Sequence, residues 1–254
     1  MIKTFSRITV FNDQGRNIEL RCLKASDALF VHEAIEESLL ELKTFLAWPH
    51  IPMNVRQREL FLDKCYEQGQ AGHGFYMGLF CQTKNRFISG AGLHPRCPLN
   101  PLSLEIGYYT RTSEVAKGWA TLLTQILTAA SLLWLGADTV RVSCAENNPW
   151  SKRVIERCGF KFEALLRNWT ASPTQEMRDG GYVASPNSCM YSLITQDIPD
   201  ISEWLAPLVK QMKVYSHSGS QIFPQLDGDH ISFDQGLKIN QNSCEHPFRR
   251  DTMC

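Results

Sequence analysis

Residues 104–160 constrain the fold more than any other part of the chain. The apolar pattern predicts a strand over residues 104–110 and a tight turn around Gly118. A long helix is expected to follow to about residue 135, then a second strand over residues 139–144 and a short helix. A strand, helix, strand order of this kind predicts a layered α/β arrangement.

The turn around Gly118 suits a phosphate group. A helix leaves its first backbone N–H groups without internal partners, and these donors lie at the positive end of the helix dipole. Gly118 lets the backbone approach an anion where a side chain would block it. Ordinary helices also begin after glycine, so the turn alone leaves both interpretations open.

Further motifs follow in a characteristic order. Residues 105–110 read Glu-Ile-Gly-Tyr-Tyr-Thr, Asn148-x-x-Ser151 opens the short helix, and Gly159-Phe160 ends it. Together with the turn they resemble the acyl-CoA-binding core of the GNAT superfamily of N-acetyltransferases, in detail its RimJ/RimL branch. The resemblance covers roughly residues 18–193. It implies an α/β (α+β) GNAT fold, with a mixed, mostly antiparallel sheet that is splayed at its middle and flanked by helices on both faces.

The resemblance implies acetyl-CoA as the acetyl donor and indicates which residues would hold it. The turn would present backbone N–H groups to the pyrophosphate, the end of the strand would pair with the pantetheine arm, and Asn148 and Ser151 would face the same cleft. Asn148 before a proline is also a sound helix cap, and Lys117 is as well explained by a solvated lysine. The implied set is Tyr109, Thr110, Val115, Ala116, Lys117, Gly118, Trp119, Ala120, Thr121, Asn148 and Ser151.

Two positions depart from the family pattern. Many members carry Gln or Arg where Val115 stands, which weakens the inference of a phosphate site but leaves its backbone donors. Branches that protonate the leaving thiolate with tyrosine place it where Ile155 stands. Ser151 is then the remaining candidate for the general acid.

Glu105 is the candidate general base. It is a single carboxylate on an apolar central strand, where desolvation would raise its pKa toward neutrality. The alternative is a salt bridge to Arg21 or to another basic residue. His94, at the end of the preceding strand, is a weaker rival.

The acceptor is the least defined part of the sequence. The RimJ/RimL resemblance implies a protein N-terminal α-amine as the most favoured acceptor. A small amine or an aminoglycoside would require the same chemistry, and a non-catalytic acyl-CoA sensor or interaction protein is a third hypothesis. Phe45, Trp48 and His50 are candidate contacts with the acceptor, although Phe45 and Trp48 also fit an apolar core.

Composition excludes some classes of binding partner. The chain has 26 Lys and Arg against 26 Asp and Glu, so no overall charge indicates nucleic acid, and no apolar run is long enough to cross a membrane. Its nine cysteines are scattered without a C-x-x-C pair, which gives no support to a metal site and favours reduced thiols in a cytoplasmic protein. By analogy with relatives, a homodimer is possible.

The sequence divides into a GNAT domain over residues 1–196 and a C-terminal extension over residues 197–254. In the extension, apolar residues between 204 and 212 predict a short helix, and the remainder is an irregular polar segment. Near the other end, residues 28–47 are expected to be helical up to Trp48-Pro49, and Asn54 is expected to open a helix that ends near Gly69.

Overall fold

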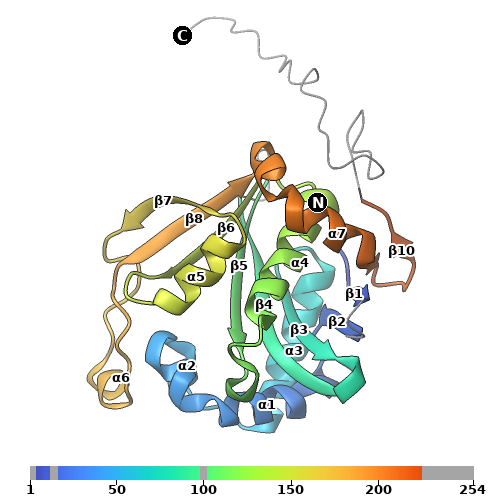
Figure 1. The fold of residues 1–254 in the computed structure, drawn as a ribbon. Helices are drawn as coiled ribbons and strands as arrows, with labels where there is room; N and C mark the ends of the chain where they lie inside the picture. Colours follow the sequence, from blue (N-terminus) through green and yellow to red (C-terminus); the bar gives the residue numbers. More distant parts are fainter. Residues whose placement is uncertain (1–3, 12–16, 98–101, 225–254) are drawn as a thin grey trace, which may run out of the picture.

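The computed structural model describes residues 4–11, 17–97 and 102–224. Within them one sheet of ten strands forms the centre, in the order β10-β9-β1-β2-β3-β4-β5-β6-β8-β7 (Figure 1). The strands are β1 (Arg7–Phe11), β2 (Asn17–Cys22), β3 (Phe75–Cys81), β4 (Arg86–Cys97), β5 (Ser103–Thr110), β6 (Thr139–Ala145), β7 (Lys161–Leu166), β8 (Ser188–Ile194), β9 (Met212–Tyr215) and β10 (Gln221–Ile222). The helices are α1 (Ala28–Glu37), α2 (Leu39–Phe45), α3 (Val55–Gln70), α4 (Trp119–Leu133), α5 (Pro149–Arg157), α6 (Gln175–Asp179) and α7 (Ser202–Gln211).

The strand directions make the sheet mixed and mostly antiparallel. Strands β1 to β5 pair antiparallel in sequence order, and β8 pairs antiparallel with both β6 and β7. Only β5 and β6 run parallel among the described pairs. A parallel pair needs a long crossover connection, which α4 provides. The predicted fold class is confirmed.

Helices cover both faces of the sheet. On one face α4, α5 and α7 contribute Leu123, Ile155 and Leu205 to the larger apolar core. On the other face α1 and α3 build a smaller core with β3 and β4. Because side chains alternate along a strand, β5 sends Ile106 into the larger core and packs Tyr109 against the smaller one.

The C-terminal extension packs on the sheet as far as residue 224. The expected helix is present as α7. After it, β9 pairs with β1, and neither of these two strands was predicted from the sequence. The indole of Trp134 at the end of α4 donates a hydrogen bond to the carbonyl of Ile222 in β10, at 3.0 Å. The rest of the predicted polar segment, residues 225–254, lies outside the described residues. In the part of the chain that the structure describes, no helix is both long and apolar enough to cross a membrane.

The helical region before Trp48 is broken where one helix was expected. Helix α1 ends at Glu37 and α2 starts at Leu39, with Ser38 between them. The Ser38 hydroxyl is fully buried and accepts a hydrogen bond from the Thr112 amide at 2.9 Å. Helix α3 begins as predicted, because the Asn54 side chain accepts from the Gln57 amide at 2.9 Å.

Candidate functional site

A gap opens in the sheet between β5 and β6. The two strands pair only from Ser103↔Thr139 to Ile106↔Val142. Beyond that point β5 continues to Thr110 against β4, while β6 continues to Ala145 against β8. Figure 1 shows β6, β7 and β8 turning away from β5. The facing edges, Gly107–Thr110 and Ser143–Ala145, do not pair with each other, so an extended ligand could use their backbone groups.

The turn before α4 lies at the end of this gap. Ala116 and Gly118 have φ of +59° and +81°, in the left-handed region, and residues 115–118 are exposed. Gly118 is the N-cap of α4 and no side chain caps the helix there. A Cβ added at Gly118 would meet nothing within 4 Å. A 15-residue helix therefore begins at an exposed glycine with open space beside it, which suits an anion.

The side chains of the turn have mainly structural contacts. The Lys117 ammonium donates to the Ser113 carbonyl at 2.6 Å and to the Glu114 carboxylate at 3.2 Å. The buried indole of Trp119 also donates to Glu114, at 3.1 Å. Burial alone would raise the pKa of Glu114, but the hydrogen bonds from Lys117 and Trp119 lower it. Ala120 and Thr121 complete the half-buried first turn of α4.

Glu37 fixes the loop that leads into the turn. Its carboxylate accepts hydrogen bonds from the Arg111 guanidinium at 2.5 Å and from the Ser113 amide at 3.0 Å. Arg86 lies 3.5 Å from the same carboxylate. Burial opposes ionisation, but the hydrogen bonds from Ser113 and Arg111 lower the pKa of Glu37 to about 2. The break between α1 and α2 thus places Glu37 and Ser38 where they hold the loop.

Asn148 and Ser151 lie at the start of α5, across the gap from β5. The Asn148 side chain accepts from the Ser151 amide at 3.1 Å, so the helix-capping role is present. Tyr108 of β5 lies beside Ser151; burial raises the pKa of its hydroxyl, and the Ser151 hydroxyl opposes that rise. The buried Tyr108 hydroxyl has no hydrogen-bond partner of good geometry among the described residues. Ile155, in contrast, is fully buried in the core.

Glu105 is buried and already has two partners. Its carboxylate accepts from Arg96 Nε at 2.6 Å and from the Ser143 hydroxyl at 2.8 Å. Arg21, the partner weighed from the sequence, instead forms a two-point hydrogen bond with Asp27 at 2.6 and 2.7 Å. Glu105 lies directly opposite His94 in the β4–β5 pair.

His94 lines a cavity on the α1–α3 face of the sheet. Burial and the charge of Arg96 lower the pKa of His94, and nearby Glu105 only partly offsets them, so the imidazole is neutral at pH 7. A neutral imidazole can accept a proton. The sequence places His94 at the end of the preceding strand, whereas β4 continues to Cys97 and His94 lines the cavity.

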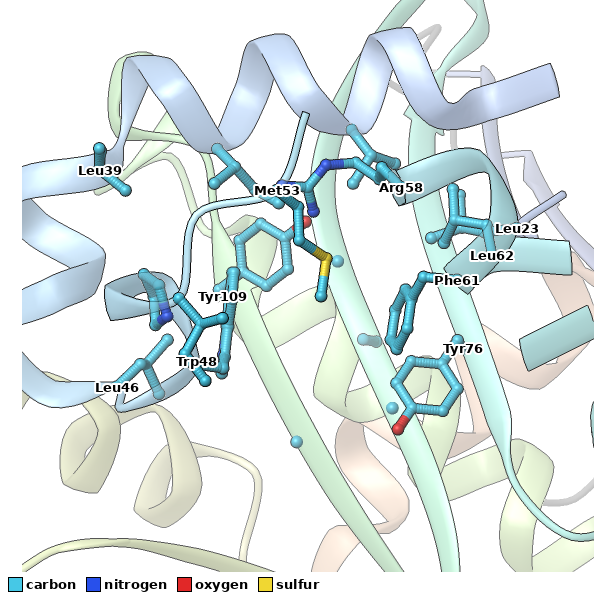
Figure 2. A pocket seen from close by; sticks show the side chains of 18 of the residues that line it. Leu23, Leu39, Leu46, Trp48, Met53, Arg58, Phe61, Leu62, Tyr76 and Tyr109 are labelled. Carbon is cyan, nitrogen blue, oxygen red and sulfur yellow. The ribbon is translucent and has the colours of Figure 1, made fainter. Parts of the chain in front are cut away.

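The cavity has a volume of about 750 Å³ and is mainly apolar. It lies between α1, α2 and α3 and strands β3, β4 and β5, and it reaches Gly107, Tyr108 and Tyr109 at the gap. Figure 2 shows Trp48 beside Tyr109 on one side, with ring centroids 5.5 Å apart, and Phe61 beside Tyr76 on the other. Gly107–Tyr109 thus borders both the gap and the cavity.

The three residues expected at the acceptor wall have different places. Trp48 is 41% exposed and lines the cavity, as does His50, whose Nε2 lies 3.0 Å from the Lys43 carbonyl. Phe45 instead packs against Trp150 of α5, with ring centroids 5.9 Å apart, and does not line the cavity.

Sequence reasoning missed three side chains of this region. Tyr108 could have been found, because alternation along β5 places it opposite Tyr109 and toward α5. Glu37 carries no local signal, since its partners Arg111 and Ser113 lie in a distant loop. Arg58 of α3 is 6% exposed and lines the cavity, but in the sequence it is one more charged residue on an amphipathic helix.

Comparison with known families gives one match. The family model described as an acetyltransferase (GNAT) domain matches residues 17–161. No curated protein sequence is significantly similar to this chain.

Solved structures share the fold at low sequence identity. The ribosomal alpha-N-protein acetyltransferase RimL in complex with coenzyme A is 20% identical, with a TM-score of 0.61 over 70% of this chain and 93% of that one. Mycobacterium smegmatis RimJ with a CoA disulfide is 14% identical, with a TM-score of 0.63 over 83% and 96%. The microcin C7 self-immunity acetyltransferase MccE with acetyl-CoA and AMP is 17% identical, with a TM-score of 0.61 over 72% and 93%.

Proposed function

Because the chain belongs to the GNAT acetyltransferase family, we propose that it transfers an acetyl group directly from acetyl-CoA to a primary amine. The observation that carries this proposal is the meeting of two spaces at Gly107–Tyr109. This segment borders the gap between β5 and β6 on one side and the apolar cavity on the other. Two reactants held at one point react with a large entropic advantage, worth roughly 7–11 kcal/mol of the barrier.

The donor fits the gap and the turn. The backbone amides that follow Val115 in the turn bind its diphosphate, helped by the open space at Gly118; the Val115 amide itself donates to the Thr112 carbonyl at 3.2 Å. The unpaired edge at Tyr109 and Thr110 holds the extended pantetheine by main-chain hydrogen bonds, and Asn148 and Ser151 line the opposite side. Lys117, whose ammonium is held by Glu114 and Ser113, contributes through its backbone.

Acetyl-CoA supplies the acetyl group as an activated thioester. A backbone N–H at the unpaired end of β5 polarises the carbonyl. Glu105 accepts the proton that the amine loses, with Arg96 and Ser143 fixing its carboxylate. The Ser151 hydroxyl passes its proton to the leaving sulfur as it takes one from solvent water, so no alkoxide accumulates. His94 is the second candidate base, because it lines the cavity with a lowered pKa.

A protein N-terminal α-amine is the favoured acceptor. RimL and RimJ, which share the fold, support this choice, and so does a cavity that reaches Gly107–Tyr109 at the gap. A small amine is the alternative acceptor. Initial rates with ribosomal N-terminal peptides and with aminoglycosides distinguish the two: the proposal expects the peptides to be acetylated at least tenfold faster.

Thiol release from acetyl-CoA tests the activity itself. We expect CoA to appear in step with an acetylated amine across a panel of peptides and small amines. Tight acetyl-CoA binding measured by calorimetry, with no thiol released by any amine of the panel, would instead identify a non-catalytic acyl-CoA sensor.

A further inference from the structure

Arg58 places a positive charge inside the apolar cavity. It lies in the first turns of α3, whose start is fixed by the reciprocal hydrogen bonds of Asn54 and Gln57, each 2.9 Å long. Arg58 is 6% exposed and lines the cavity. Two residues earlier, Arg56 has a 75% exposed side chain and pairs with Glu59 at 2.8 Å. The two arginines on one helix therefore have opposite environments.

The Arg58 side chain has no hydrogen bond or ion pair with any described residue, and its Nε is buried without a partner. Figure 2 shows its guanidinium directed into the cavity beside the Tyr109 hydroxyl. Burial lowers the pKa of Arg58, while Tyr109 and Glu36 oppose that effect. A guanidinium nevertheless remains charged at neutral pH.

Glu36 does not satisfy this charge. Its side chain is 54% exposed, and it reaches His32 at 4.0 Å rather than Arg58. A buried cation without a partner is strongly unfavourable, and folded proteins normally pair or neutralise such groups. The planar guanidinium is well suited to a carboxylate or phosphate, which it binds by two parallel hydrogen bonds.

We propose that Arg58 binds the anionic group of the acceptor, a carboxylate or a phosphate, while the apolar part of that acceptor fills the cavity. This rests on the proposed acetyl transfer and narrows it to amines that also carry an acidic group. The Tyr109 hydroxyl beside Arg58 provides a second donor to the same anion. Burial raises the pKa of Tyr109, so this hydroxyl keeps its proton.

Acceptor pairs that differ in one anionic group test this proposal. The pairs are the tripeptide amides Ala-Phe-Glu and Ala-Phe-Gln, phenylalanine and phenylalaninamide, and tyramine phosphate and tyramine. We expect the anionic member of at least one pair to have a kcat/KM roughly 10- to 100-fold higher, the range of a charge-assisted hydrogen bond. Each pair represents one type of anion: a peptide side-chain carboxylate, a free α-carboxylate or a phosphate. The pair that shows the preference therefore identifies the type that Arg58 binds.

The variant Arg58→Met replaces arginine with an unbranched, apolar side chain and so removes the charge. We expect it to bring the anionic-to-neutral ratio of kcat/KM to near one, whereas the matched control Arg56→Met keeps the wild-type ratio. Arg58→Lys should restore part of the preference. Thermal unfolding of each variant confirms that it is folded.

Two results would overturn the assignment: an unchanged ratio in Arg58→Met, or a wild type that prefers the anionic member in none of the three pairs. If the wild type acetylates none of these amines, the proposed activity fails for them, yet calorimetry still tests the anion site. N-acetylphenylalanine and tyramine phosphate should then bind the wild type at least tenfold more tightly than Arg58→Met. Equal affinity would refute the anion site independently of catalysis.

Discussion

The substitution Gly118→Glu tests whether the turn binds an anion. A matched substitution at a second glycine measures the backbone strain that any side chain in a left-handed conformation causes. Gly118 has φ of +81° and no neighbour within 4 Å of an added Cβ. A non-glycine residue in this conformation costs roughly 1–2 kcal/mol, with no clash to add. Gly136, beyond the far end of α4, offers a matched control: its φ is +70° and its added Cβ would also meet nothing within 4 Å.

Charge distinguishes the two sites. A carboxylate about 5 Å from a phosphate would repel it by about 0.8 kcal/mol in water and about 3 kcal/mol at an effective dielectric constant of about 20. Because the turn is exposed, we expect Gly118→Glu to weaken acetyl-CoA binding by about 1–3 kcal/mol, or roughly 5- to 150-fold. Gly136→Glu should leave that affinity unchanged.

Isothermal titration calorimetry of both variants with acetyl-CoA measures this difference, and thermal unfolding measures the shared strain. Gly118→Ala measures how far backbone strain alone, without an added charge, changes acetyl-CoA affinity. The effect of Gly118→Glu should also shrink at about 1 M salt, where the Debye length falls to about 3 Å. The reasoning is refuted if Gly118→Glu and Gly136→Glu bind acetyl-CoA with equal affinity at low salt.

Two further substitutions and one labelling experiment test the surrounding contacts. Glu105→Gln should lower kcat by roughly 10²- to 10⁴-fold at unchanged acetyl-CoA affinity; a loss below tenfold, measured by stopped assays, would reduce Glu105 to a structural partner of Arg96. Glu37→Gln should destabilise the protein by about 1–2 kcal/mol at neutral pH, a value discounted from the full pKa shift because the Glu37 side chain is 29% exposed. Since the pKa of Glu37 falls from 4.5 to about 2 on folding, its contribution is complete above about pH 5 and is lost toward pH 2, so denaturation midpoints of wild type and variant should converge over that interval. Iodoacetamide should modify half-buried Cys144 slowly at pH 8, because burial raises its pKa to about 11, and CoA should slow it further by filling the gap; unchanged labelling of Cys144 with saturating CoA, read by mass spectrometry, would contradict that placement.

Local patterns predicted the parts of the fold that depend on neighbouring residues. Asn54 opened α3 as expected, because a cap involves residues only three positions apart. The strand, turn and helix around Gly118 were likewise predicted, since glycine in a left-handed conformation and an apolar helix leave a local signal.

Features made by residues distant in the chain were not predictable. Strand β9 has four residues, and its partner β1 lies some two hundred positions earlier, so no periodicity identifies it. The partner of Glu105 is Arg96 rather than Arg21, because Arg21 is engaged by Asp27. Arg58 becomes a candidate for ligand binding only when its burial is known, because the sequence does not show which charged residues of α3 are buried.

A crystal structure with CoA bound tests the central claim most directly. The account predicts a pantetheine arm in the gap between Gly107–Thr110 and Ser143–Ala145, hydrogen-bonded to the backbone of β5. It also predicts a diphosphate on the backbone amides of the turn around Gly118. A complex in which β5 and β6 close on each other, or in which CoA lies away from Gly118, would contradict it.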